Sequence, residues 1–437
     1  MNNLRLLAGV LCVLLPEVGA LCQTRRVVTL EEIYRTAEAG SAKLRTAYAS
    51  EREADSEIAE KRDARLPDIS AEASVGFIGD GFTTKRDFTD YQRAPIPHLS
   101  NGIGLTVSQP LYTGGAIKNS IEMAELKSTA ARFATDLQRD NLRMRLTGYY
   151  LDIYKYHNLR RVVDSNLAAA QRVLKDMHAR YEQGTVLLND ITRYELLVSN
   201  LELEITRIDN TLRILNNNLV TLAGMAPETV IIPDSTLIDR AVQVPGLSQW
   251  QQEATESSPQ LKLARNGVEI SRKAEELVLA DRRPKIGVQA GWSLNGPILV
   301  EVPPINRNLS YWYVGVGISY NISSLYKNNR TRARSRAATV VAQNRLDEAG
   351  EDVALAVNEA HIRWQESQTE LATRNKGVEL AMRNYKTVST RYGAGMALIT
   401  DLLDAANSRL DAEQQLVNAR INIIYNYYRL LFTSGKI

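Results

Sequence analysis

The sequence predicts a mainly helical protein with membrane β-strands, in which one strand-and-helix repeat occurs twice. Three observations predict this fold. Long segments without proline carry unbroken heptad patterns, and four segments of about ten residues alternate apolar and small polar side chains. In addition, short motifs recur at a fixed interval in the two halves of the chain.

The composition excludes several classes of protein. There are 53 basic and 50 acidic residues, and this near balance gives no electrostatic basis for binding nucleic acid. The mean hydropathy is negative, which argues against a bundle of transmembrane helices. Both cysteines, Cys12 and Cys22, lie near the N-terminus. The rest of the chain therefore contains no disulfide, thiolate metal site or cysteine nucleophile.

Residues 1–22 are predicted to be a secretory signal peptide. Arg5 precedes a short apolar run over 6–15, and small residues follow it. Cleavage after Ala20 and cleavage after Cys22 both fit this pattern. Two alternatives are a lipid anchor on Cys22, although the residues before it depart from a lipobox, and an ordinary buried N-terminal helix. Export argues against a cytosolic role.

Four segments read as β-strands of the outer-membrane type. Each places apolar side chains on one face and small polar side chains on the other: 68–77, 102–111, 286–295 and 312–321. Their length and two-residue period are typical of strands that cross an outer membrane. Two soluble hairpins, each with one face on a core, are the alternative. The segments 80–101 and 296–309 are predicted to be long loops on the outer side of the membrane.

Long helices are predicted to follow each strand pair. Residues 116–183 and 328–392 contain no proline, and at 1.5 Å per residue each helix would be on the order of 100 Å long. Shorter helices are predicted over 30–65, 187–223, 260–282 and 398–432. Apolar residues from Leu187 to Leu222 follow spacings of four and three without a break, which predicts a coiled-coil seam against a partner helix.

The second half of the chain repeats the first. The motif residues Arg180-Tyr181, Gly184 and Asp190 recur 211 residues later as Arg391-Tyr392, Gly395 and Asp401. Such self-similarity indicates an internal duplication of strands, long helix and short helix.

The number of strands predicts an oligomer. Four strands cannot close a barrel, and an open sheet edge cannot face lipid because its N–H and C=O groups would lack partners. Two copies would give eight strands, whose interior is filled by side chains, whereas three copies would give twelve strands and leave a lumen. Since glycine and serine occupy the polar face of the strands, we predict three copies and an open lumen.

The order of these features resembles the TolC-like outer-membrane efflux proteins. The strand exit Gln109-Pro110-Leu111-Tyr112-Thr113-Gly114-Gly115, the signal peptide, the long helices and the duplication carry the resemblance. It implies a homotrimer with a 12-stranded β-barrel in the outer membrane, continuous with a coiled-coil tunnel of helices in the periplasm. Residues 23–225 and 258–437 would each supply a helix, two barrel strands and two tunnel helices, and residues 226–257 would form an equatorial segment.

The resemblance also implies a function and partners. The chain would form the passive exit duct of a tripartite efflux or type I secretion system, docked to a periplasmic adaptor and an inner-membrane transporter. Outer-membrane lipid would surround the barrel, and no cofactor, enzymatic activity or nucleic-acid partner is expected. A structural coiled-coil protein of the cell envelope without a channel is the alternative, although such a fibre has no use for four amphipathic strands.

The resemblance assigns roles to four residues near the ends of the tunnel helices. Asp401 and Asp404 match the paired acidic residues of the channel constriction. Asp190 and Tyr392 match residues that make gating bonds. The alternative for each aspartate is an ordinary acid at a helix start, where the helix dipole favours negative charge.

Two glycines and one missing charge complete this expected site. Gly184 and Gly395 are expected in the turns between the paired helices. The family places a basic residue two positions after the second glycine, but this sequence has Ala397 there. Arg391 and Arg193 are the candidates to replace it.

No catalytic or metal site is predicted. Gly114-Gly115 lies in neither phosphate-loop motif, and the four histidines show no zinc-binding spacing. The alternating arginines at the start of the second long helix are predicted to face solvent or lipid headgroups: Arg330, Arg332, Arg334 and Arg336.

Overall fold

The computed structural model describes residues 24–234, 244–301 and 303–437, so the predicted signal peptide lies outside it. The chain divides into two compact units. Of the described residues, the bundle unit contains 24–41, 145–234 and 367–425, and the sheet unit contains 42–144, 244–301, 303–366 and 426–437. Within the described ranges, no helix is both long and apolar enough to cross a membrane.

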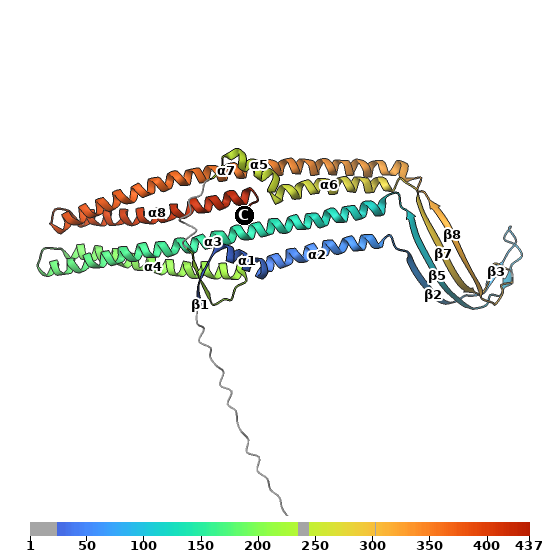
Figure 1. The fold of residues 1–437 in the computed structure, drawn as a ribbon. Helices are drawn as coiled ribbons and strands as arrows, with labels where there is room; N and C mark the ends of the chain where they lie inside the picture. The colour runs from blue at the N-terminus through green and yellow to red at the C-terminus, as the bar shows by residue number, and fades with distance from the viewer. Residues whose placement is uncertain (1–23, 235–243, 302) are drawn as a thin grey trace, which may run out of the picture. The chain divides into compact units, whose positions relative to one another are not determined.

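The elements of the two halves follow one another in the same order (Figure 1). The first half contains β1 (Thr24–Val28), α1 (Leu30–Gly40), α2 (Ala42–Asp63), β2 (Asp68–Phe77), β3 (Gly81–Thr83), β4 (Gln92–Ala94), β5 (Leu99–Tyr112), α3 (Ala116–Glu182) and α4 (Leu188–Ala223). The second contains β6 (Thr229–Pro233), α5 (Leu247–Ser257), α6 (Pro259–Ala280), β7 (Lys285–Gly296), β8 (Leu309–Ser319), α7 (Ser324–Gly393) and α8 (Ile399–Thr433). Helices α5 and α6 and strand β7 each begin 217 residues after α1, α2 and β2.

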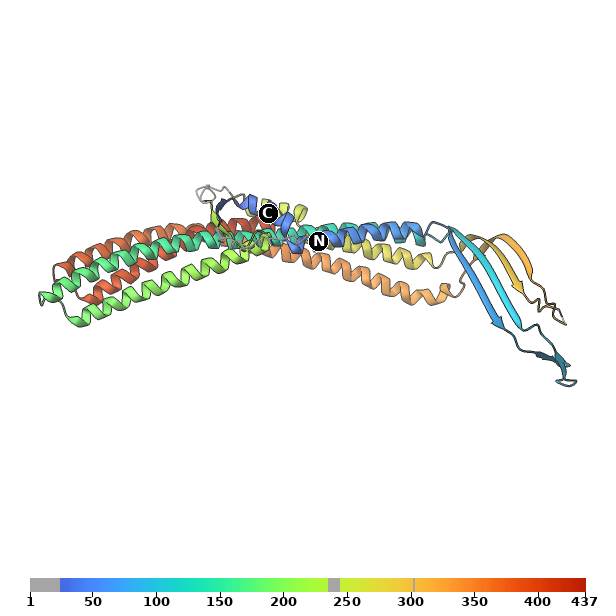
Figure 2. The same cartoon turned by 90° about the horizontal axis from the view of Figure 1, so that it is seen from below.

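All four predicted membrane strands are present and form one antiparallel sheet in the order β2-β5-β7-β8 (Figures 1 and 2). The register of the strands places apolar residues beside apolar residues and small polar residues beside small polar residues. Val107 lies between Ile69 and Ala290, whereas the next residue back, Thr106, lies between Ser70 and Gly291. Every residue of the two edge strands, β2 and β8, is exposed in the single chain.

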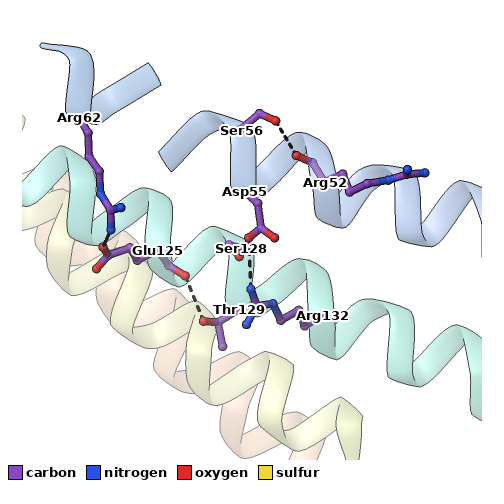
Figure 3. A network of polar contacts seen from close by, with 8 residues as sticks. All are labelled: Arg52, Asp55, Ser56, Arg62, Glu125, Ser128, Thr129 and Arg132. Carbon is purple, nitrogen blue, oxygen red and sulfur yellow. Dashed lines mark hydrogen bonds and ion pairs between the residues drawn. The ribbon is translucent and has the colours of Figure 1, made fainter. Parts of the chain in front are cut away.

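The helices of the sheet unit follow the order of the strands to which they connect. Ion pairs join α2 to α3, α3 to α6 and α6 to α7, namely Arg62–Glu125, Lys273–Glu122 and Arg336–Glu275, at 2.8, 2.9 and 3.0 Å. Figure 3 shows the ion pair between Arg62 and Glu125. Nearby on the same two helices, Asp55 of α2 bonds Ser128 and Arg132 of α3. Helix α2 therefore lies at one edge of this layer and α7 at the other.

Two predicted segments are wrong in part. The segment 80–101 is not all loop, because β3 and β4 form a hairpin on which Phe82 stacks against Tyr91 with ring centroids 4.5 Å apart. The helix predicted over 30–65 is broken at Ser41, which has an extended conformation. The break follows Gly40, where a Cβ atom would lie 3.0 Å from the carbonyl oxygen of Ala223.

A two-stranded parallel sheet, β1 with β6, was not predicted from the sequence. Tyr150 of α3 holds it through its buried hydroxyl, which donates to the carbonyl oxygen of Val28 (3.0 Å) and accepts from the backbone N–H of Asp234 (2.8 Å). Burial raises the pKa of Tyr150 to about 12. These bonds give hydrogen-bond partners to the carbonyl group of Val28 and the N–H group of Asp234 at the ends of the two strands.

Candidate functional site

The turns α3–α4 and α7–α8 of the bundle unit have the same backbone design. Gly184 and Gly395 adopt positive φ angles of 73° and 72°, which side chains larger than hydrogen rarely permit. In each turn the glycine N–H bonds the carbonyl three residues back, at 2.8 and 3.0 Å, and the next N–H bonds the carbonyl five residues back, at 3.0 and 2.8 Å. This Schellman pattern ends α3 and α7 at equivalent places.

Arg180 joins the two turns, a role that the sequence did not reveal. Its Nη1 atom donates to the carbonyl oxygen of Gly393 at 2.9 Å, and its Nε atom lies 2.9 Å from the carboxylate of Asp176. The end of α7 is therefore hydrogen-bonded to the last turn of α3 within one chain.

Tyr392 and Asp190 lie near one another at this end of the bundle. Burial is the main cause that raises the pKa of Tyr392, and the negative charge of Asp190 adds to it, while Arg180 opposes it. Asp190 occupies the first turn of α4, where its N–H bonds the carbonyl oxygen of Leu187 at 3.0 Å. Tyrosine, carboxylate and guanidinium groups from three helices are thus brought together.

Asp401 and Asp404 occupy the start of α8, and both are exposed in the single chain. A carboxylate oxygen of Asp401 accepts the backbone N–H of Leu398 at 3.0 Å, which is one half of a capping box. Asp401 therefore has the local role of a helix-start acid. Because the two residues lie three apart, their charges share one face of the helix and can attract cations there.

The two candidates for the missing basic residue lie in different surroundings. Arg391 donates to the carbonyl oxygen of Met396 in its own turn at 3.4 Å, close to Ala397. Arg193 lines a groove of about 570 Å³ between α4 and α8, together with Leu403 and Asn407.

The predicted heptad seam on α4 forms the apolar core of the bundle unit. Its buried members pack with residues of α3 and α8, namely Ile191, Tyr194, Val198, Leu201 and Ile208 with Val163, Ala170, Met177, Ile399 and Leu402. Burial varies along the seam, since Leu187 is exposed, Leu212 is only partly buried and Leu219 is fully buried.

A polar network crosses this core and includes residues from four helices of the bundle unit, α3, α4, α7 and α8. Asn166 of α3 donates to Glu413 of α8 at 2.7 Å, and Glu413 pairs with Arg409 at 2.9 Å. The guanidinium of Arg409 lies 5.1 Å from the ring centre of Tyr385 on α7. Tyr194 of α4 lies next to Tyr385; burial is the main cause that raises the pKa of Tyr194, and the nearby Tyr385 adds to it. Tyr194 and Tyr385 lie at positions for which heptad spacing predicts apolar packing, whereas no pattern in the sequence marked Asn166, Arg409 or Glu413 as members of this core.

Comparison with known families matches both halves of the chain. Residues 33–225 and 250–436 match the family described as Outer membrane efflux protein. The chain is 22% identical over 402 residues to outer membrane efflux protein BepC of Brucella suis, covering 91% of this chain and 83% of that protein. It is 21% identical over 422 residues to outer membrane protein TolC of Vibrio cholerae, covering 96% and 93%.

Solved structures share the fold at low sequence identity. The outer-membrane channel OprN superposes with a TM-score of 0.77 at 17% identity, over 93% of this chain and 90% of that chain. The outer membrane protein VceC of Vibrio cholerae superposes with a TM-score of 0.75 at 16% identity, over 93% and 96%.

Proposed function

Because the chain belongs to the outer membrane efflux protein family, we propose that it is the channel subunit forming the exit duct of a tripartite export system. It resides in the cell outer membrane, and its helices form a large periplasmic part. One observation carries the proposal most directly. A four-stranded sheet with membrane-type alternation ends in two unpaired edge strands and continues into long helices.

The assembly that completes this sheet is a homotrimer. Three copies supply twelve strands, enough to close a barrel around a water-filled lumen, and their unpaired edges satisfy one another. The residue division follows the repeat, with a signal peptide over 1–22, repeats over 23–225 and 258–437, and an equatorial segment over 226–257. Extraction of outer membranes should yield a trimer that dissociates only on heating. A monomer in the soluble fraction would contradict the assembly.

The partners are a periplasmic adaptor and an inner-membrane transporter, which supplies the energy for efflux or type I secretion. The duct itself is passive, so the proposal contains no catalytic step and no cofactor. Deleting the gene should increase sensitivity to exported compounds or abolish secretion of a protein, and a plasmid copy should restore either property.

The turn end of the bundle unit is the candidate gate. Under threefold symmetry, Asp401 and Asp404 place six carboxylates around the axis, which favours cations. The bonds near Tyr392, Asp190 and Arg180 hold the helix ends in a closed arrangement, and the turn glycines permit the hinge.

Planar-bilayer recording tests this gate. The wild-type trimer should be cation-selective with low conductance and should be blocked by a trivalent cation. Asp401→Ala with Asp404→Ala should weaken both selectivity and block. Tyr392→Phe should raise the conductance. Unaltered selectivity in the double variant would remove the constriction and leave the barrel intact.

A further inference from the structure

The order of elements in the sheet unit places α2 with β2 at one edge and α7 with β8 at the other. In a barrel built from several copies, β8 of one copy meets β2 of the next. The helix that leads into β2 is then brought beside the helix that leaves β8. This neighbourhood rests on the proposed function, because a lone chain keeps α2 and α7 apart (Figures 1 and 2).

The outer face of α7 carries a basic stripe near β8. Lys327, Arg330 and Arg334 follow spacings of three and four, so they share one face, and all three are exposed. The opposite face is turned to α6, where Arg336 pairs with Glu275 and Asn328 donates to the carbonyl oxygen of Val278 at 2.8 Å. Within the part of the chain that the structure describes, the three stripe residues have no ion-pair partner.

Helix α2 carries a matching acidic stripe. Glu53 and Glu60 lie seven residues apart on one exposed face. Asp55 and Arg62 are turned to α3 instead, where they bond Arg132 and Glu125. Among the described residues Glu53 has no ion-pair partner, and Glu60 bonds only its exposed sequence neighbour Lys61, at 2.8 Å. Glu57, between them, already bonds Lys127 of α3 at 2.7 Å.

The two stripes lie at the same distances from the strands. Glu60 precedes the first residue of β2 by eight residues, and Lys327 follows the last residue of β8 by eight. Glu53 and Arg334 are each fifteen residues from the same strand ends. Because all these residues are helical and helices rise 1.5 Å per residue, opposite charges come level when the two strand ends are level.

We propose that the basic stripe of α7 docks against the acidic stripe of α2 in a second copy of this chain, pairing Lys327 with Glu60 and Arg334 with Glu53. Arg330 lies between these pairs, at the level of Glu57. The seam aligns neighbouring copies directly below the barrel, where a slip of the β8–β2 pairing by one residue would turn every side chain to the wrong face.

Charge reversal tests the seam. Lys327→Glu with Arg334→Glu should lower the yield of trimer in low salt at least about threefold, and Glu53→Lys with Glu60→Lys should do the same. The fourfold variant, in which both stripes are reversed, should recover the wild-type yield. Arg345→Glu is the matched control, since Arg345 is exposed on the same face of α7 but level with Ala42, so it should not reduce the yield.

Cysteine pairs test the geometry independently of stability. Glu60→Cys with Lys327→Cys should give disulfide-linked dimers and trimers on a non-reducing gel. Glu60→Cys with Asn329→Cys should not, because Asn329 lies on another face of α7. If the basic stripe instead binds lipid headgroups, reversing the acidic stripe will have no effect and the first pair will not cross-link, which would overturn the seam. A wild-type chain that forms no trimer would instead contradict the proposed function.

Discussion

The helical bundle around α4 and the four-stranded sheet bury their apolar side chains in different ways. In the bundle, Ile191 and Tyr194 are each 1% exposed within one chain. In the sheet, Val316 is 69% exposed and Phe77 is 79% exposed. The bundle therefore has a core of its own, whereas the apolar side chains of the sheet stay exposed in the single chain, which is unfavourable in water. A single chain thus buries its apolar surface in the bundle and leaves it exposed in the sheet.

The largest expected effect lies in the bundle core. Ile208→Asp would bury an unpaired carboxylate at a site that is 2% exposed, and it should destabilise the fold by at least about 4 kcal/mol. Thermal melting followed by circular dichroism measures the loss, in detergent as well as in the membrane.

The neighbouring residue provides the control for the bundle core. Asp209 forms a partly exposed ion pair with Arg160 at 2.7 Å, so Asp209→Ala should cost less than about 1 kcal/mol. If Ile208→Asp melts like the wild type, the bundle does not close its core within one chain.

Substitutions on the apolar face of the sheet should reduce stability only when that face is in contact with lipid. Val107→Arg, on the apolar face of β5, should cost roughly 2–4 kcal/mol near the middle of the bilayer. Thr106→Arg, on the polar face of the same strand, should assemble better. The yield of heat-modifiable trimer in outer membranes separates the two variants, and equal yields would remove the distinction between lipid and lumen faces.

The polar network of the bundle should show a smaller effect. The side chains of Arg409 and Glu413 are only 16% and 14% exposed, so Arg409→Leu would leave a poorly solvated carboxylate with Asn166 as its remaining partner. We expect a loss of about 2 kcal/mol. The double variant Arg409→Leu with Glu413→Leu should regain most of the lost stability, as measured by urea unfolding. If the double variant is no more stable than Arg409→Leu, the loss comes from packing and not from the unpaired charge.

A pH effect should come from Asp140 of α3 in the sheet unit, a carboxyl that is buried within one chain. Burial raises the pKa of Asp140 to about 6, against the attraction of Arg139 and Arg143. The folded state therefore favours the protonated carboxyl, and its stability should fall as the pH rises from about 4 to 6.

The neutral variant isolates that pH effect. Asp140→Asn should flatten the dependence over this range and raise the stability at pH 7 by about 1–2 kcal/mol. Melting temperatures of both proteins across the range provide the measurement. An unchanged slope in the variant would assign the pH dependence to other groups.

Local periodicity predicted the elements well. Strand β2 has the predicted bounds, 68–77, and α4 begins one residue after the predicted start at 187. A two-residue or heptad period depends only on residues that are close in sequence, so it can be recognised without knowing what their side chains contact. The turn glycines were found for the same reason, since a positive φ angle is a local demand.

Contacts between distant segments were missed. The break at Ser41 depends on Gly40 meeting Ala223, and β1 pairs with β6 from the other half of the chain. No sequence pattern predicts these pairings, because the side chains involved are small or are ordinary strand formers.

The sequence by itself determined the strand and helix periods and the duplication, because each follows from the spacing of residues along the chain. Only the tertiary structure decided which charges lie inside. Arg409 and Glu413 look like an ordinary surface pair four residues apart, yet the packing of four helices buries them beside Tyr385. The tertiary structure likewise placed the stripes of α2 and α7 at opposite edges of the chain, because the helices follow the strand order, and long-range order cannot be read from local spacing.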